Sequence, residues 1–463
     1  MERLTGLDGA FLSLESPTTH LQILGALIFD PGEVEGGVDF WSVRDMVAGR
    51  VHLVPPFRKR MIEVPFGLQQ PSMVDDPDFD IDFHVRRARL PDPGGLAELA
   101  VLAADLASRP LDRRRPLWEF HVVEGLEHGH LAVIPKVHHS IIDGVSGAEV
   151  LAAFFDLEPK PAPRRLFAPH PGVRSMRRPD AGDRPSEESP PAGATPDAPP
   201  WSPDPLPAPF AAPRTSINRA ISPHRRVAFA ALPLRDVRRV REVLGGTAND
   251  VVLAATSGAM RAFFADRGEV LDRSLVAMVP VSVRAPSERD ALGNRVSALL
   301  VSLASGVEDA AARFRHIRDG METAKEQSRS IGPDVFAGWA QAILPAVGTR
   351  LSRIVTNLRL FDHLAPVFNL IVSNVPGPDF PLYLAGARMV AMYPLGPIVE
   401  GVGVNVTVFS YLDTMYAGVQ ACWDLAPDID TIARGLEHSL DELVHEADRR
   451  VRPVPWWHAE LPA

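Results

Sequence analysis

The sequence predicts a mixed α/β protein, with mixed sheets flanked by helices, that folds as two parts. The chain has 463 residues, which is too long for one ordinary hydrophobic core. Short apolar runs typical of buried strands occur in both halves, among segments with helix-start signals and helical spacing. A stretch rich in Pro, Ala, Asp and Ser interrupts this pattern between residues 158 and 213. These observations exclude an all-helical chain.

The interruption defines the predicted domains. Residues 158–213 contain runs such as PSEESPPAGATPDAPP. Such a composition cannot bury enough apolar surface to offset the entropy of ordering, so we expect a flexible or extended linker. Residues 1–157 and 214–463 are then the two folded parts.

The first part contains a strand, a loop and a helix in succession. His130 to Val137 is an apolar run suited to a buried strand, and Pro135 within it favours an edge strand or a bulge. Ser146 and Glu149 form a capping-box pattern that begins a helix. Residues 138–144 are therefore expected in a loop between strand and helix.

The second part repeats this mixture. Thr247 and Asp250 open a predicted helix, with Val251, Ala255 and Phe263 on one side. Five apolar runs are expected to form strands: Leu275–Val283, Val296–Leu303, Val367–Val375, Gly403–Tyr411 and Ala417–Trp423. Residues 335–361 are expected to form one or two amphipathic helices.

Composition limits the possible partners and compartment. The chain carries 48 Lys and Arg against 58 Asp and Glu, a net charge of −10, which argues against a nucleic-acid partner. Its one cysteine, Cys422, excludes an intramolecular disulfide. The N-terminus lacks the layout of a signal peptide, and no apolar run reaches the length of a membrane span. We expect a cytoplasmic protein that is not secreted.

The segment KVHHSIIDGVSG, residues 136–147, carries the clearest chemical signal. A neutral imidazole accepts a proton near neutral pH, which suits a reaction that turns an alcohol into a nucleophile. Adjacent residues of an extended chain point in opposite directions, so one of His138 and His139 is expected to face a substrate. The other, with Asp143, is expected to hold the loop.

Two other interpretations of the pair stay open on the residues alone. A metal site is one, but the sequence has no accompanying Cys/His cluster and no HExxH pattern, so no metal is expected. A buried structural pair is the other, and Asp143-Gly144 by itself is an ordinary turn signal.

The chain also resembles a known family. His138 to Gly144 matches the HHxxxDG motif of the coenzyme A-dependent acyltransferase superfamily, and the rest is similar to the bacterial wax ester synthase/diacylglycerol acyltransferases. The similar segments, in chain order, are residues 4–16, 79–91, 115–120 (with the PLW motif), 246–255 (with the ND motif), 280–284, 293–297 and 369–378. They cover both folded parts and omit the linker.

The resemblance implies a fold and a mechanism. It implies two chloramphenicol-acetyltransferase-like domains with an active-site channel between them. His139 is implied to be the general base, with His138 beside it, Asp143 as structural support of the loop and Gly144 completing the motif. The oxyanion formed at the thioester needs a hydrogen-bond donor, which the sequence does not identify.

Two further motifs have implied supporting roles. Pro116, Leu117 and Trp118 are expected to pack beneath the active-site loop or along the acyl channel. Asn249 and Asp250 are expected at the start of a helix, where Asp250 favours the helix dipole and Asn249 caps the helix, or in contact with substrate.

The implied reaction moves a long-chain acyl group from acyl-coenzyme A to diacylglycerol, or to a long-chain alcohol. No cofactor is expected, because acyl-coenzyme A is a substrate. Residues 335–361 either rest on a membrane or lipid-droplet surface, such as the inner face of the plasma membrane, or pack as core helices. The alternatives are an enzyme with a carrier-protein-bound acyl donor and an inactive homologue that binds lipid droplets.

Overall fold

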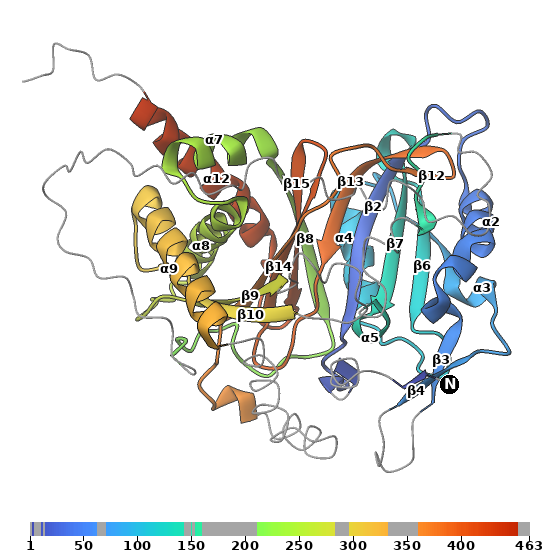
Figure 1. Cartoon of the computed structure of the whole chain (residues 1–463), viewed down its shortest axis with the longest axis horizontal. Helices are drawn as coiled ribbons and strands as arrows, with labels where there is room; N and C mark the ends of the chain where they lie inside the picture. The colour runs from blue at the N-terminus through green and yellow to red at the C-terminus, as the bar shows by residue number, and fades with distance from the viewer. Residues whose placement is uncertain are drawn as a thin grey trace, which may run out of the picture.

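The computed structural model of the chain describes residues 2–3, 11–12, 14–62, 71–142, 150, 153–159, 211–282, 296–331 and 360–451. Its elements form two six-stranded sheets, each with helices packed on it (Figure 1). From left to right, Figure 1 shows the helices of the C-terminal sheet, that sheet, the N-terminal sheet, and helices α2 (Phe40–Arg50) and α3 (Ile81–His84). The predicted mixed α/β class is confirmed.

The N-terminal sheet is mixed. Its strands, in spatial order, are β12 (Tyr383–Leu384), β13 (Ala387–Leu395), β2 (Gln22–Asp30), β7 (Leu131–His138), β6 (Trp118–Glu124) and β5 (Val85–Arg89). All neighbours are antiparallel except β5 and β6, which are parallel. Both faces of its central strands are buried: Leu27 and Phe29 of β2 belong to one apolar cluster, and Ala26 and Ile28 to another.

The strand expected at His130 to Val137 is confirmed as β7, but the interpretation of Pro135 is wrong. β7 pairs with β2 on one side and β6 on the other, so it is neither an edge strand nor bulged. Its register with β2 is the same before and after Pro135, and pairing is missing only opposite Gly25 and Ala26. Proline lacks the N–H that the ladder needs, so a local gap in the ladder accommodates Pro135 within a central strand.

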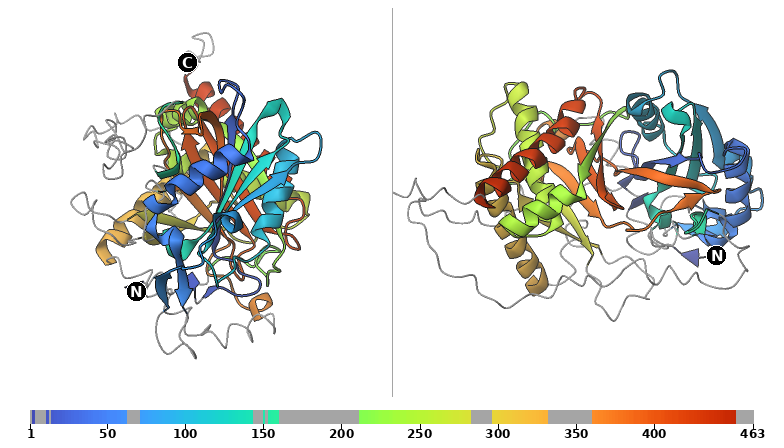
Figure 2. Two further views of the ribbon diagram at one scale, coloured as in Figure 1. Left: turned by 90° about the vertical axis from the view of Figure 1, so that its right-hand side faces the viewer. Right: turned by 90° about the horizontal axis from the view of Figure 1, so that it is seen from above.

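The position of strand β13 does not follow the predicted domain division. It belongs to the predicted second part, residues 214–463, yet it pairs with β2 of the first part from Arg388 to Leu395. Seen from above in Figure 2, this orange segment extends among the strands of the N-terminal half. Residues 1–157 alone therefore do not complete their own sheet. Of the linker predicted at 158–213, residues 160–210 lie outside the described part of the chain.

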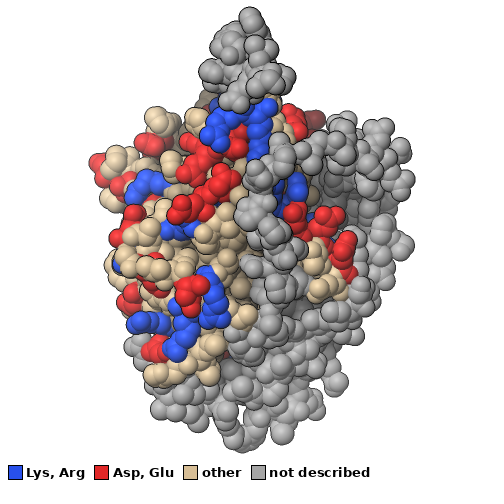
Figure 3. Space-filling model, turned by 90° about the vertical axis from the view of Figure 1, so that its left-hand side faces the viewer, with Lys and Arg blue, Asp and Glu red and all other residues tan. Residues whose placement is uncertain are grey.

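The C-terminal sheet contains the five strands expected in the second part. Its spatial order is β10 (Val296–Ser302), β9 (Val276–Ser282), β11 (Leu370–Val375), β14 (Val404–Tyr411), β15 (Thr414–Cys422) and β8 (Arg225–Pro233). One face packs on α7 (Leu234–Leu244), α8 (Ala248–Asp266), α9 (Ala310–Ile331) and α12 (Asp430–Val451). Acidic and basic side chains are mixed on the face shown in Figure 3.

The predicted helix start at Thr247 is confirmed. The Thr247 side chain accepts from the Asp250 N–H, and the Asp250 carboxylate accepts from the Thr247 N–H at 2.7 Å, which is a complete capping box. Gly245 and Gly246 both have a φ of +81°, a conformation that glycine adopts without strain. Thr247, and not Asn249, is the N-cap, because Asn249 already lies within the helix.

Helix α4 (Leu96–Ala107) lies between the two sheets, in a cluster with β2 and with Val227 of β8. Beyond it, the sheets approach directly where Gly418 of β15 meets the carbonyl oxygen of Pro394 of β13. The Tyr393 ring packs there against Phe229 in a tilted contact and against Tyr416 edge to face, with centroids 4.6 and 5.1 Å apart. The two halves thus share a packed interface.

The remaining elements are short. A small sheet has the order β1 (Glu2–Arg3), β4 (Ser72–Asp75) and β3 (Lys59–Ile62). The short helices are α5 (His139–Ile142) and the 3₁₀ turns η1 (Val51–Leu53), η2 (Pro55–Arg58), η4 (Glu127–Gly129) and η8 (Leu360–Asp362). The amphipathic helices expected at 335–361 lie outside the described residues, except at 360–361.

Candidate active site

The two histidines lie at the junction where β7 ends and α5 begins. His138 is the last residue of β7 and is 1% exposed, whereas His139 is half-buried. The N–H of His138 donates to the Leu117 carbonyl at 3.0 Å, and the N–H of His139 donates to the Leu21 carbonyl at 2.9 Å. Leu117 precedes β6 and Leu21 precedes β2, so the backbone of the pair is held from both neighbouring strands.

Both ring nitrogens of His138 face polar groups. Nδ1 lies 2.7 Å from the Ser140 hydroxyl and accepts from the Ser140 N–H at 3.1 Å. Nε2 lies 3.3 Å from Oε1 of Glu15, but its direction does not satisfy hydrogen-bond geometry. We therefore describe the Glu15 contact as an electrostatic one. In the neutral ring, acceptance at Nδ1 leaves the proton on Nε2, on the side of Glu15.

Glu15 joins this histidine to an arginine. Nη2 and Nε of Arg113 donate to Oε2 of Glu15 at 2.6 and 3.1 Å, and Nη2 also donates to the Leu12 carbonyl at 3.2 Å. Burial by itself raises the pKa of Glu15, but the contacts from His138 and Arg113 outweigh it and lower the pKa to about 2. Glu15 is therefore a carboxylate at neutral pH.

The His139 ring stacks on Phe11, with centroids 4.4 Å apart and planes 24° from parallel. This contact restricts the orientation of the ring from one side. Asp143 and Gly144, the remaining predicted residues of the motif, lie outside the described part of the chain.

The structure brings the PLW residues next to the histidine pair. Pro116, Leu117 and Trp118 are buried, and Leu117 is the residue whose carbonyl holds His138. The Trp118 ring stacks between His84 and Phe57, at 4.6 and 4.8 Å, and its Nε1–H donates to the Phe57 carbonyl at 2.8 Å. Trp118 thus anchors the start of β6 beside the site.

The ND residues lie in the C-terminal half. Asp250 is 3% exposed, and the hydrogen bonds that the structure gives its side chain are those of the α8 capping box. Asn249 is half-buried in the first turn of the same helix. Among the described contacts, neither residue meets the histidine pair.

The sequence matches known proteins along nearly its whole length. The wax ester synthase/diacylglycerol acyltransferase catalytic domain matches residues 4–252, and the C-terminal domain of that family matches residues 292–444. A Mycobacterium tuberculosis protein named as a diacylglycerol O-acyltransferase is 35% identical over 97% of this chain and 91% of its own length. Another so named from that species is 32% identical over 96% of this chain and 99% of its own length.

The chain belongs to the wax ester synthase/diacylglycerol acyltransferase family.

Solved structures agree with this assignment. The wax ester synthase/diacylglycerol acyltransferase from Marinobacter aquaeolei VT8 is 28% identical, with a TM-score of 0.73 over 97% of this chain and 100% of that chain. The first condensation domain of the calcium-dependent antibiotic synthetase shares the fold, with a TM-score of 0.56 at 14% identity over 97% of each chain. The family resemblance and the implied two-domain fold are confirmed. As a family member the chain is an acyltransferase, which takes an acyl donor and an acyl acceptor.

Sequence reasoning missed three residues of this acyltransferase site: Phe11, Glu15 and Arg113. Phe11 and Glu15 lie in the similar segment 4–16, and Arg113 lies just before the PLW motif. Glu15 lies between Leu14 and Ser16 in a largely apolar segment, and an acidic residue there was a signal for a buried partner. No local pattern predicts that this partner is 98 residues away.

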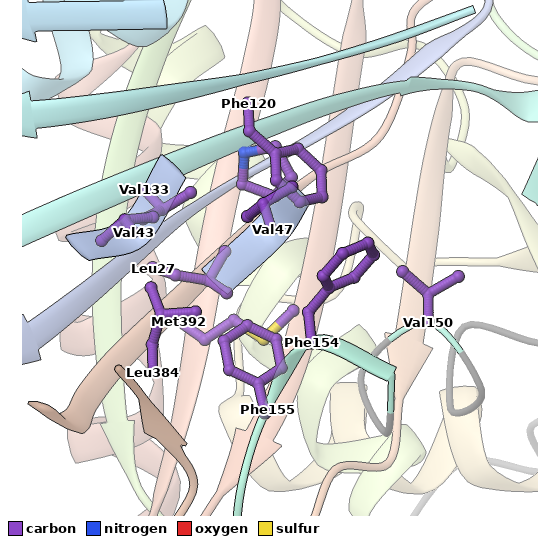
Figure 4. A pocket seen from close by; sticks show the side chains of 11 residues that line it. Leu27, Val43, Val47, Phe120, Val133, Val150, Phe154, Phe155, Leu384 and Met392 are labelled. Carbon is purple, nitrogen blue, oxygen red and sulfur yellow. The ribbon is translucent and has the colours of Figure 1, made fainter. Parts of the chain in front are cut away.

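An apolar cavity of about 70 Å³ lies on one face of the N-terminal sheet (Figure 4). Its lining comes from β2, α2, β6, β7, β12, β13 and the segment around Phe154: Leu27, Val43, Val47, Phe120, Val133, Pro135, Val150, Phe154, Phe155, Leu384 and Met392. In Figure 4, the rings of Phe154 and Phe155 lie along one side of this space. Cavities with such walls accept hydrocarbon and not water.

The described residues contain neither a candidate membrane span nor a candidate metal site. No helix within the described ranges is long and apolar enough to cross a membrane. Across the same residues, His, Cys, Asp and Glu side chains form no group of three that could hold a metal ion.

Proposed function

We propose that this acyltransferase moves a long-chain fatty acyl group from acyl-coenzyme A to diacylglycerol, and also to long-chain alcohols, with His139 as the general base. The observation that carries the proposal is the placement of the histidine pair. In a chain that matches this family over both halves, a buried His138 lies beside a half-buried His139. The names of the relatives support the acceptor.

The difference between the two rings supports His139 as the base. His138 is 1% exposed, and its two nitrogens face Ser140 and Glu15. A hydroxyl substrate has little access to such a ring. His139 is half-buried and begins a helix, so its ring is the one that a substrate can approach.

The proposed reaction is direct transfer. His139 takes the proton from the acceptor hydroxyl while the oxygen attacks the thioester carbonyl, and the carbonyl oxygen becomes an oxyanion. When this intermediate collapses, the carbon–sulfur bond breaks, the ester forms, and the proton passes from His139 to the thiolate of coenzyme A. No acyl-enzyme and no cofactor take part, and the orientation of two bound substrates supplies much of the rate.

The apolar cavity suits the distal part of the acyl chain. Val133 and Pro135 of its wall lie on β7, which leads to the histidine pair. At about 3.3 Å per residue, Pro135 lies roughly 10 Å before His138 along the strand. A long acyl chain whose carbonyl is beside His139 is long enough to span this distance and reach the cavity.

We propose further that the protein meets its lipid substrates at a membrane or lipid-droplet surface, as a peripheral protein in the cytoplasm. The apolarity of diacylglycerol and the amphipathic pattern at residues 335–361 support this. Flotation with anionic vesicles tests it, because a protein that stays at the bottom of the gradient does not bind that surface.

The activity is tested with purified protein, radiolabelled palmitoyl-coenzyme A and either diacylglycerol or hexadecanol. We expect labelled triacylglycerol or wax ester from the wild type, none from His139→Ala, and normal product from His52→Ala, which removes an exposed histidine. If folded wild type gives no product with either acceptor, the acyl-coenzyme A proposal is wrong, and a carrier-protein-bound donor or a lipid-binding protein without turnover becomes the better account. Equal product from His139→Ala would remove His139 as the base.

A further inference from the structure

A chain of polar contacts enters the site from the N-terminal segment. Arg113 donates to Glu15 with two N–H groups, and Glu15 faces Nε2 of His138. Nδ1 of His138 in turn contacts Ser140, the residue that follows His139 in the sequence. The side chain of Glu15 is 11% exposed and that of His138 is 1% exposed, so water does little to weaken the contact. We propose that Glu15, oriented by Arg113, is a positioning residue that sets the tautomer of His138 and thereby the placement of His139. This inference rests on the proposed role of His139.

A fixed backbone donor constrains the tautomer of His138. The Ser140 N–H donates to Nδ1 of His138 at 3.1 Å, and a backbone N–H cannot become an acceptor. The neutral ring therefore carries its proton on Nε2, where a carboxylate is the favourable neighbour. The Ser140 N–H and the Glu15 carboxylate therefore favour the same tautomer, and a neutral residue at position 15 would leave only the Ser140 N–H to maintain it.

Arg113 completes the arrangement by holding Oε2 while Oε1 faces the histidine. Nε and Nη2 of the guanidinium both donate to this one oxygen, which holds the carboxylate more firmly than a single ammonium group would and leaves Oε1 for His138. Other charged or titratable groups whose fields reach Glu15 are His20 and Lys136. Burial lowers the pKa of His20 below its usual value, so this ring adds no positive charge at neutral pH, and Arg113 is the cation in direct contact with Glu15.

The same segment reaches the other half of the molecule. Three residues after Glu15, the Thr18 hydroxyl donates to Glu400, and the Thr18 carbonyl accepts from Arg225. Three residues further, the Leu21 carbonyl holds the N–H of His139. Glu15 thus begins a short segment that touches both histidines and the C-terminal half.

A second Glu–Arg ion pair, Glu124 with Arg87, provides a control that distinguishes a positioning role in catalysis from an effect on stability alone. Glu124 accepts from Nε and Nη2 of Arg87 at 2.9 and 2.7 Å, and its side chain is 16% exposed. This geometry is close to that of Glu15 with Arg113. Glu124 is the last residue of β6, whereas the histidine pair lies beside the start of that strand. Glu124→Gln therefore removes a similar pair at a distance from the site.

The experiment compares Glu15→Gln, Glu15→Asp, Arg113→Lys and Glu124→Gln in two assays. In acyl transfer, we expect Glu15→Gln to lower kcat by about 10- to 100-fold, with KM within twofold of wild type. Its pH–rate profile should shift, because the negative charge beside His138 is removed. Glu15→Asp and Arg113→Lys should each keep part of the activity, and Glu124→Gln should match the wild type in kcat and in pH profile.

The second assay needs no turnover. Nitrogen-15 NMR of labelled histidines, assigned with His138→Gln, reports the protonated nitrogen of His138. We expect Nε2–H in the wild type and in Glu124→Gln, and a mixture of tautomers in Glu15→Gln. An unchanged tautomer and unchanged kcat in a folded Glu15→Gln protein would overturn the proposal. If the wild type proves inactive in acyl transfer, the proposed function fails, and the tautomer measurement still decides the role of Glu15.

Discussion

Gly418 of β15 and Pro394 of β13 bring the backbones of the two sheets into direct contact. A Cβ atom at Gly418 would overlap the Pro394 carbonyl oxygen, and Leu395 closes the space from the side. Since β13 belongs to the N-terminal sheet and β15 to the C-terminal sheet, this contact sets how closely the two halves pack.

Gly418→Ala should therefore destabilise the molecule. Overpacking against a backbone atom that cannot move alone costs about 1–3 kcal/mol or more. Denaturant unfolding followed by circular dichroism measures this change. Gly320→Ala is the control, because Gly320 lies in α9 with open space around it, and alanine should stabilise that helix by about 0.5–1 kcal/mol. A Gly418→Ala protein as stable as the wild type would contradict the tight approach.

Glu15 should make stability depend on acid pH. Its pKa is about 2 in the folded protein against an ordinary value of 4.5, so the folded state binds fewer protons between these values. The contribution of Glu15, about 3 kcal/mol, is fully present above pH 4.5 and is lost as pH falls towards 2. We expect the unfolding free energy of Glu15→Gln to fall less over this range than that of the wild type. Parallel curves for the two proteins would show that the carboxylate has no such linkage.

Lys136 should make stability depend on alkaline pH. It is 1% exposed, burial lowers its pKa to about 8, and its ammonium group donates to the Arg109 carbonyl at 2.7 Å. The folded state thus binds fewer protons than the unfolded state between pH 8 and 10.5, so the wild type should gain stability as pH rises through that range. Lys136→Met should be more stable than the wild type at pH 7, and the difference should shrink by pH 10. A less stable Lys136→Met protein at pH 7 would show that the bond to Arg109 outweighs desolvation.

Phe11 should matter for turnover because its ring stacks on His139. Such a pair is worth about 0.5–1.5 kcal/mol, so Phe11→Leu should lower kcat by about 2- to 10-fold. The bound substrates do not depend on this ring in the proposed mechanism, and KM should change little. Steady-state kinetics decide the point, and a rise in KM at constant kcat would instead indicate a binding role.

Filling the apolar cavity should change the preferred acyl length. Val133 contributes to its wall from β7, and Val133→Phe should occupy the space proposed for the distal end of the acyl chain. We expect the ratio of kcat/KM for palmitoyl-coenzyme A over that for octanoyl-coenzyme A to fall. A ratio equal to that of the wild type would place the acyl chain elsewhere.

Much of the local structure could be predicted from the sequence. The strand before His138, the five strands of the second part and the Thr247 capping box lie where their patterns indicated. These signals depend on residues a few positions apart, and they are therefore visible in one sequence. The family motifs identified the site, because they occur along this chain in the same order as in the family.

The fold class, the family and the position of the histidine pair follow from the sequence alone. The folded chain was needed to show that β13 completes the N-terminal sheet, that a central strand accommodates Pro135, that Glu15 and Phe11 contact the histidines, and that Arg113 binds Glu15. Periodicity and capping are short-range effects, whereas strand pairing and buried ion pairs join residues far apart in the chain. Such contacts depend on how the whole chain packs, and no local pattern of residues encodes that.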